Sequence, residues 1–346
     1  MLPKFSLRTI FLALCVSSGV ACAASSKTAL PELKLDPSRV AVAGLSSGAY
    51  MAGQAQMAYP ELFANAALVA GGPYGCAGGE LKRALTTCMK GEPAADVDAL
   101  VALAEKRSAA GELGPLKDLA HAHVYLLHGS ADTTVAPTVA EAGVHFYQTL
   151  REASPSLSGM QITDDGVRDF AHNLPVAGNG DDCGKSVSPY LGHCGFDAAG
   201  AIFAQMFGPS THAVAASAKG ELRTFDQDAL RPQGVDAFLA STGYVYVPPA
   251  CAAGKPCGLM VAFHGCKQDA DAVGEAFVND AGFNRWADAY DVAVLYPQTR
   301  ASFAPLNPQA CWDWWGYSGA DYDTRHGVQL RWLVNAVRAL GLPAGH

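Results

Sequence analysis

The chain has 346 residues, a formal net charge of −8 and an apolar content of 50%. Its Lys and Arg residues are scattered and form no basic patch. Because an acidic surface repels the phosphates of nucleic acid, we do not expect this chain to bind DNA or RNA. No run of about 20 apolar residues is present to span a membrane. The length allows a large buried core, and no low-complexity linker divides it. We therefore expect one domain over residues 24–346.

The first residues have the pattern of a secretory signal peptide over residues 1–23. Lys4 and Arg8 precede an apolar stretch at 10–16, and the small residues at 21–23 resemble a cleavage site. Secretion is the expectation that follows. Lipid modification of Cys22 is a second possibility, but the leucine typical of such a site is missing.

Eight cysteines remain after this segment is removed, an even number that suits full pairing in an oxidising compartment. Nearness in sequence favours three disulfides that close short loops, Cys76–Cys88, Cys183–Cys194 and Cys251–Cys257. The two cysteines that remain would form the long-range pair Cys266–Cys311. Other connectivities stay open. A zinc site is the alternative, but no C-x-x-C pair occurs. We expect no metal.

Short apolar runs bounded by turn residues predict buried strands, and amphipathic stretches between them predict helices. The strands are expected at 40–44, 67–70, 124–127, 244–247, 259–263 and 292–296. The helices are expected at 49–59, 96–109, 136–152, 271–290 and 325–340. Near-continuous apolar strands alternating with helices predict an α/β fold, doubly wound, with a mostly parallel sheet.

Ser46 lies in the pentapeptide Gly44-Leu45-Ser46-Ser47-Gly48, between a predicted strand and a predicted helix. This strand–turn–helix context holds a serine as an exposed nucleophile. The turn crowds the backbone two residues to either side, which explains a glycine at both places. The competing interpretation is that Ser46 only caps the helix, which accounts for neither glycine.

An activated serine needs a base and an acid that orients the base. Asp132 follows the predicted strand at 124–127, at the sheet edge where such sites form; a role in the turn alone is the alternative. The chain order Ser, Asp, His favours His172 as the base. Less favoured candidates are His193, expected at the surface beside a disulfide, His145, inside a helix, and Asp164 and Asp165, which follow no comparable strand end.

The oxyanion hole requires two backbone N–H groups. Ser47 at the helix N-terminus can supply one, and Cys266, after the predicted strand at 259–263, the other. In ordinary α/β-hydrolases the His-Gly segment precedes the nucleophile, whereas His264-Gly265 follows it here by more than two hundred residues. A circular permutation would explain this order. It predicts that the chain near Leu35 meets the end of the last helix, on the sheet end opposite Ser46.

These residues resemble the polyhydroxybutyrate depolymerase and feruloyl/acetylxylan esterase superfamily, and most closely its single-domain, circularly permuted poly(3-hydroxybutyrate) depolymerases. The resemblance rests on GLSSGAYMA, LLHGSADTTV, AHNLP, VAFHGCKQ and CWDWWG, and runs through most of the chain. It implies an α/β-hydrolase fold, secretion, disulfides, no cofactor, and a triad of Ser46, Asp132 and His172. It also implies an oxyanion hole at Ser47 and Cys266, and a substrate-lining role for Trp312, for which burial in the core is the alternative.

The expected activity is hydrolysis of poly(3-hydroxybutyrate) or its oligomers through an acyl-enzyme. A feruloyl or acetylxylan esterase with the same triad is the first alternative, and a secreted polyester-binding protein without turnover is the second. No separate polymer-binding domain is recognisable in the sequence. Adsorption to solid polyester would then require apolar surface on the catalytic domain, unless the substrate is a soluble oligomer.

Overall fold

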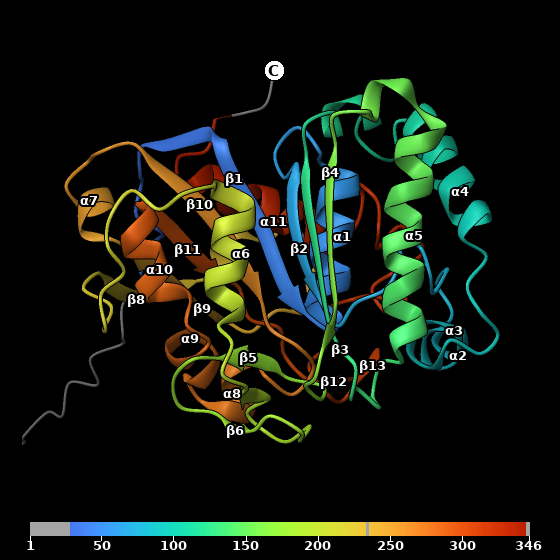
Figure 1. Ribbon diagram of the computed structural model, residues 1–346. Coiled ribbons are helices and arrows are strands. Elements are labelled where there is room, and N and C mark those ends of the chain that lie inside the picture. Colours follow the sequence, from blue (N-terminus) through green and yellow to red (C-terminus); the bar gives the residue numbers. More distant parts are fainter. Residues whose placement is uncertain (1–27, 233–234, 344–346) are drawn as a thin grey trace, which may run out of the picture.

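The computed structural model describes residues 28–232 and 235–343, so the expected signal peptide lies outside the described residues. An eight-stranded sheet runs through the molecule in the order β4-β3-β2-β1-β10-β11-β9-β8 (Figure 1). Its strands are β1 Leu35–Leu45, β2 Asn65–Val69, β3 His123–Gly129, β4 Gln161–Arg168, β8 Glu221–Asp226, β9 Thr242–Val247, β10 Cys257–Phe263 and β11 Val292–Tyr296. β9 pairs antiparallel with both β11 and β8, and the other five pairings are parallel, which confirms the predicted mostly parallel sheet.

Helices cover both faces of the sheet and divide the core into two clusters (Figure 1). One face packs against α1 Ser47–Ala58, α4 Val97–Ala109, α5 Pro137–Ala153 and α11 Val328–Ala339. The other packs against α6 Ala198–Phe207, α9 Ala276–Asp280 and α10 Phe283–Tyr290. Successive side chains of β1 point to opposite faces, so Val40 and Val42 join the first cluster and Ala41 and Ala43 the second.

Shorter elements gather at the end of the sheet to which the β1 arrow points in Figure 1. They are α2 Leu81–Leu85, α3 Thr87–Lys90, α8 Ala270–Val273, β5 Leu174–Val176, β6 Asp181–Asp182, β7 Leu191–His193, β12 Ser302–Phe303 and β13 Leu306–Asn307. One further short helix, α7 Pro249–Ala252, lies between β9 and β10. The connections at this end supply most of the walls of the site described below.

All six predicted strands are present. The two edge strands of the sheet, β4 and β8, are not among the six. β8 carries polar residues along much of its length, and β4 continues through Asp164, Asp165 and Gly166, so neither has the apolar run of a central strand. The predicted helix at 271–290 is wrong as one element. Gly274 and Gly282, at φ 60° and 89°, adopt left-handed conformations that divide it into α8, α9 and α10.

The beginning of β1 meets the end of α11, as the sequence predicted. The Leu33 N–H donates to the Leu340 carbonyl at 2.8 Å, and a Cβ on Gly341 would lie 2.1 Å from the Leu33 carbonyl oxygen. Ser46 follows the last residue of β1, so this junction lies at the opposite end of the strand. The two segments are thus neighbours in space although they are about three hundred residues apart in sequence.

Four disulfides join the expected pairs: Cys76–Cys88, Cys183–Cys194, Cys251–Cys257 and Cys266–Cys311. The first three close short loops, whereas the last links the segment after β10 to the segment after β13, 45 residues away. The Cys76–Cys88 pair belongs to a third apolar cluster, with Tyr50, Trp314 and Trp315.

The turn after β1 has no room for side chains at its two glycines. A Cβ on Gly44 would lie 2.2 Å from the Gly48 carbonyl oxygen, and a Cβ on Gly48 would lie 2.4 Å from that of Phe263 on β10. Both contacts are with backbone, which cannot swing aside. The crowding expected from the pentapeptide is therefore confirmed.

We expect Gly48→Ala to lower the free energy of unfolding by about 2 kcal/mol, because α1 must move away from β10 to admit the methyl group. Gly53→Ala, in the same helix, is the matched control. Its Cβ would find its nearest atom at 3.7 Å, so it should raise stability by about 0.5–1 kcal/mol. Urea unfolding of both variants tests this; equal stability of the two would contradict the steric account.

Candidate active site

A cavity of about 450 Å³ opens at the carboxyl ends of the central strands. Strand order reverses between β1 and β10, since the chain runs outward from β1 to β4 on one side and from β10 to β11 on the other. Open α/β sheets bind ligands at such a switch point. Ser46, Ser47, His172 and Cys266 all line this cavity, although they come from three distant segments.

Ser46 is held in a strained conformation, with φ 57° and ψ −118°. Its N–H donates to the Val69 carbonyl at 2.8 Å, which ties the turn to the neighbouring strand β2. It precedes the first residue of α1, yet its side chain makes no capping hydrogen bond. The capping alternative therefore fails, and the hydroxyl is left for the cavity that Ser46 lines.

Asp132 and His172 form a buried pair, and His172 lines the same cavity as Ser46. His172 Nδ1 lies 2.7 Å from Asp132 Oδ2, while the backbone N–H groups of Thr134 and Val135 donate to Oδ1 at 2.8 and 2.9 Å. The backbone N–H of His172 donates to Ser186 Oγ at 2.9 Å, which holds the loop that carries the imidazole. A carboxylate only accepts, so Nδ1 carries the proton and Nε2 is the basic nitrogen of the neutral ring.

A second histidine, His128, lies next to the same carboxylate without bonding to it. Its Nε2 is 3.9 Å from Asp132 Oδ2, beyond hydrogen-bond distance. Burial lowers the pKa of His128, against the opposing effect of the Asp132 charge. Because the lowered pKa favours a neutral His128, His172 is the histidine that is paired with the Asp132 carboxylate.

The other sequence candidates are engaged elsewhere. His193 is exposed, and its Nδ1 lies 2.9 Å from the Gly178 carbonyl oxygen. His145 is exposed on α5. Asp165 accepts from Tyr125 and Arg168 within and beside β4, and Asp164 accepts from the Gly166 N–H. None of these four lines the cavity.

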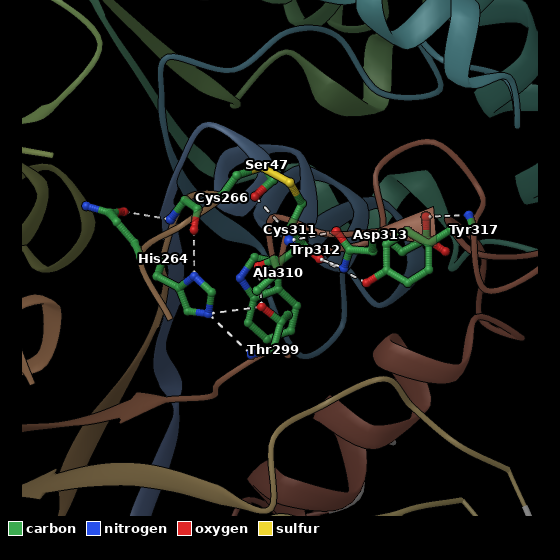
Figure 2. Close-up of a disulfide and its surroundings, with 12 residues drawn as sticks. Ser47, His264, Cys266, Thr299, Ala310, Cys311, Trp312, Asp313 and Tyr317 are labelled. Atoms are coloured by element: carbon green, nitrogen blue, oxygen red, sulfur yellow. Dashed lines mark hydrogen bonds between the residues drawn. A yellow bond between two sulfur atoms is a disulfide. The ribbon is translucent and has the colours of Figure 1, made fainter. Parts of the chain in front are cut away.

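The segment after β10 lines the same cavity as His172. The Cys266–Cys311 disulfide joins it to the segment after β13, and the Trp312 N–H lies 3.4 Å from Ser47 Oγ (Figure 2). Ser47 and Cys266, the two expected N–H donors, thus belong to segments that are both joined to the segment carrying Cys311 and Trp312.

The structure corrects the role expected of Trp312. Its side chain is 1% exposed and packs against Phe263 and His264, with ring centroids 5.0 and 5.5 Å away, so it supports the floor and does not line the cavity. The tryptophans that line it are Trp314, stacked on Tyr50 at 4.9 Å, and Trp315. The Trp314-Trp315 doublet in the same motif was a visible signal for them.

Other cavity residues were not identified from the sequence. Ser186 and Gln268 act through hydrogen bonds across loops, and nothing in their local sequence indicates this. Leu81, Leu85 and Leu306 line the cavity and are still 39%, 50% and 55% exposed, which places apolar side chains at its mouth. Phe303, across the β12–β13 hairpin from Leu306, is 83% exposed.

Within residues 28–232 and 235–343, no group of three His, Cys, Asp or Glu side chains is placed to hold a metal ion. No helix of this part of the chain has both the length and the apolar character required to cross a bilayer.

Comparison with known proteins identifies the class. Residues 242–341 match the family described as Esterase PHB depolymerase. A poly(3-hydroxybutyrate) depolymerase of Delftia acidovorans is 35% identical over 305 residues, covering 87% of this chain and 59% of that protein. A polyhydroxybutyrate depolymerase of Talaromyces funiculosus is 33% identical over 330 residues, covering 90% of this chain and 92% of the relative.

Two solved structures of PHB depolymerases have the same fold as this chain. A serine-to-alanine variant of PHB depolymerase complexed with an R3HB trimer and the PHB depolymerase of Penicillium funiculosum superpose with TM-scores of 0.80 and 0.79. Each is 30% identical and covers 91% of this chain and 99% of its own. The chain belongs to the polyhydroxybutyrate depolymerase family of carboxylic ester hydrolases. It spans little more than half the length of the Delftia relative and nearly all of the fungal one.

Acid should destabilise the protein through His264, which lies in the floor of the site and is fully buried. Burial lowers its pKa from 6.5 to about 4. Between pH 6.5 and about 4 this histidine is protonated in the unfolded chain but stays neutral in the folded protein. The free energy of unfolding therefore decreases as the pH falls through this interval, by up to roughly 3 kcal/mol.

Urea unfolding at several pH values tests this against His264→Phe. Carboxylates contribute equally to both proteins, so their difference isolates the histidine, and the variant should lose less stability over this interval. Parallel pH profiles would contradict the assignment.

Proposed function

We propose that this protein is a secreted serine esterase that hydrolyses poly(3-hydroxybutyrate) or its oligomers. The observation that carries the proposal is the strained Ser46 in one cavity with His172, whose Nδ1 is held by buried Asp132. The family and the trimer complex of a structural neighbour support the substrate class. The four disulfides suit an oxidising compartment, which supports secretion.

In the proposed reaction, His172 Nε2 takes the proton from Ser46 Oγ as that oxygen attacks the ester carbonyl carbon. Asp132 holds the ring and stabilises the imidazolium that forms. The protonated His172 then donates to the departing alkoxide, which leaves as an alcohol, and a 3-hydroxyacyl group stays on Ser46. Water attacks the acyl carbon while His172 Nε2 takes a proton from it; the bond to Ser46 Oγ then breaks, His172 returns the proton to Ser46 Oγ, and the 3-hydroxy acid is released.

The tetrahedral intermediates carry a negative oxygen that the N–H groups of Ser47 and Cys266 are proposed to bind. Ser47 begins α1, so the positive end of the helix dipole adds to its N–H. No proton moves to or from these groups, and the reaction as written needs no cofactor.

Chain order in this protein is proposed to reflect a circular permutation of the α/β-hydrolase arrangement. The hydrogen bond from Leu33 to Leu340 supports it, because α11 could lead into β1 without moving either.

Replacing Ser46 by Ala should reduce kcat for p-nitrophenyl butyrate by about 10⁶-fold, and Asp132→Asn by about 10⁴-fold. The Asn amide oxygen would accept the two backbone N–H groups and its NH₂ would donate to His172 Nδ1, which puts the ring in the tautomer whose Nε2 carries the proton and cannot act as the base. Ser130→Ala, a change at an exposed serine near Asp132, is the control and should remain active. Release of 3-hydroxybutyrate from the homopolymer, measured by mass spectrometry, identifies the substrate. Activity retained by Ser46→Ala would refute the proposed nucleophile.

Apolar side chains at the cavity mouth should matter for solid polyester and little for soluble esters. Phe303→Ser is expected to slow clearing of a polymer suspension severalfold, since this side chain is 83% exposed on the β12–β13 hairpin, outside the cavity lining and at the same end of the molecule. Hydrolysis of soluble trimer should change less than twofold. Val235→Ser, at 45% exposure away from the cavity lining, is the control. Equal loss on both substrates would contradict an adsorption role.

A further inference from the structure

We propose that Lys267 and Tyr190 form a subsite for the free carboxylate at the acid end of a 3-hydroxybutyrate oligomer. This inference rests on the proposed function and deepens it, because it concerns the one part of the substrate that carries a charge. Such a subsite favours cutting of short oligomers next to their acid end. Neither residue is proposed to contact the reacting ester.

The cavity carries a single lysine and no acidic side chain. Among the described residues that line it, Lys267 is the one Lys or Arg, and none is Asp or Glu. A polyester is neutral along its length, so binding its interior requires no cation. Each hydrolysis, however, creates a carboxylate, which the chain's net charge of −8 repels. A lone cation in such a cavity therefore matches the acid end of the substrate.

Lys267 and Tyr190 both have a backbone conformation that side chains disfavour. Their φ angles are 61° and 59°, in the left-handed region that glycine enters without strain. The Lys267 N–H donates to the Gln309 carbonyl at 2.7 Å, and the Tyr190 N–H donates to the Val187 carbonyl at 2.6 Å. Glycine would suit either turn better if only the backbone mattered. Because strained residues gather at functional sites, the strain points to a use for these two side chains.

Gln268 brings the two strained residues together. It follows Lys267 directly, and its Nε2 donates to the carbonyls of Pro189 and Tyr190 at 2.8 and 3.3 Å. Gln268 is 1% exposed, so water does not compete for these bonds. The loops of Lys267 and Tyr190 are thus joined through one amide side chain, and both residues line the cavity together with Cys266.

The polar ends of both side chains are available to a ligand. Lys267 is exposed and Tyr190 is half-buried. Neither the ammonium nor the phenol hydroxyl is bonded to another of the residues that the structure describes. The ammonium is a cation on a flexible stem, and the hydroxyl can donate one further hydrogen bond. A carboxylate accepts at two oxygens, so it can bind both groups at once.

The direction of the ester chain decides which product carries the bound group. The acyl-enzyme keeps the part of the oligomer that ends in a hydroxyl, and the alcohol that leaves carries the carboxylate. In a terminal 3-hydroxybutyrate unit only a methine and a methylene carbon separate the ester oxygen from the carboxylate carbon. Lys267 adjoins Cys266, a proposed oxyanion donor. We therefore expect the ester at the acid end to be cut first, with 3-hydroxybutyrate as the leaving alcohol.

The test compares the linear (R)-3-hydroxybutyrate trimer with its methyl ester, whose acid end is uncharged. Lys267→Met should lower the ratio of kcat/KM for the acid to kcat/KM for the methyl ester by about five- to tenfold, mainly through KM of the acid, since it removes a charge-assisted contact. Lys267→Arg should retain most of the ratio, and Tyr190→Phe should lower it about threefold. Lys255→Met, the same loss of charge at an exposed lysine outside the cavity lining, is the control and should not alter it.

Two further measurements follow from the same charge. Added salt should lower the wild-type ratio and affect that of Lys267→Met less, because salt screens an exposed ion pair. A trimer isotopically labelled in its acid-end unit should release labelled monomer first, as detected by mass spectrometry, and Lys267→Met should weaken this order.

The subsite is overturned if Lys267→Met keeps the ratio within about twofold of wild type, if it slows both trimers equally, or if Lys255→Met lowers the ratio as much. An unaltered ratio in Tyr190→Phe removes that hydroxyl from the subsite. Lys267→Gly separates lost charge from lost structure, because glycine suits a φ of 61°. It should unfold in urea no earlier than wild type and still lose the ratio; a ratio it retained would overturn the proposal.

Ser46→Ala separates the two levels of inference. Hydrolysis of both trimers surviving in Ser46→Ala removes the proposed function itself. An inactive Ser46→Ala beside Lys267 variants that keep the wild-type ratio removes only the carboxylate subsite.

Discussion

The parallel pairing of β1 with β10 is the constraint on which the site depends. Gly44 is in register with Phe263, so the turn after β1 and the segment after β10 leave the sheet side by side. Their approach is so close that the Gly48 Cα lies against the backbone of Phe263 and His264. This one register places Ser46 and Ser47 opposite Cys266. A shift by one residue would reverse the side-chain faces of either strand and separate the two segments.

Around this pairing, most of the polar side chains near the site are satisfied by backbone groups. Asp132 accepts two backbone N–H groups besides His172, Gln268 binds three backbone groups, and Asp313 accepts three N–H groups from the loop that follows Trp312. Side chains bound to backbone fix loops more firmly than apolar contacts do, because hydrogen bonds are directional and costly to leave unmade once buried. Loops without regular structure can thereby keep the side chains of the cavity in place.

The disulfides add covalent links to these bonds. Cys266–Cys311 joins the segment after β10 to the segment after β13, which also share the hydrogen bond from the Lys267 N–H to the Gln309 carbonyl. Cys76–Cys88 lies in the small apolar cluster with Tyr50, Trp314 and Trp315. That cluster is separate from the two large cores of the sheet. The aromatic wall of the cavity thus has its own covalent support, because it projects beyond the end of the sheet.

Local sequence was sufficient to predict much of this protein. The Gly-x-Ser-x-Gly turn, the apolar strands, Asp132 at a strand end and the cysteine pairs all depend on neighbours within a few residues or on simple pairing, so they could be read directly. His172 was favoured by chain order together with its expected place in a loop, since His145 and His193 also follow Asp132 in sequence. The division of the helix at 271–290 was missed, because glycine tolerates a helix interior as well as a break and only packing decides between them.

Contacts between distant segments were decided by the tertiary structure. Trp312 and Trp314 are two residues apart in one motif, yet one supports the floor and the other lines the cavity, because the chain there turns around buried Asp313. Likewise His128, His172 and His264 are chemically identical in sequence, and only burial and hydrogen-bond partners give them different roles. Sequence determined which chemical groups are available; the packing of loops at one edge of the sheet determined which of them line the cavity.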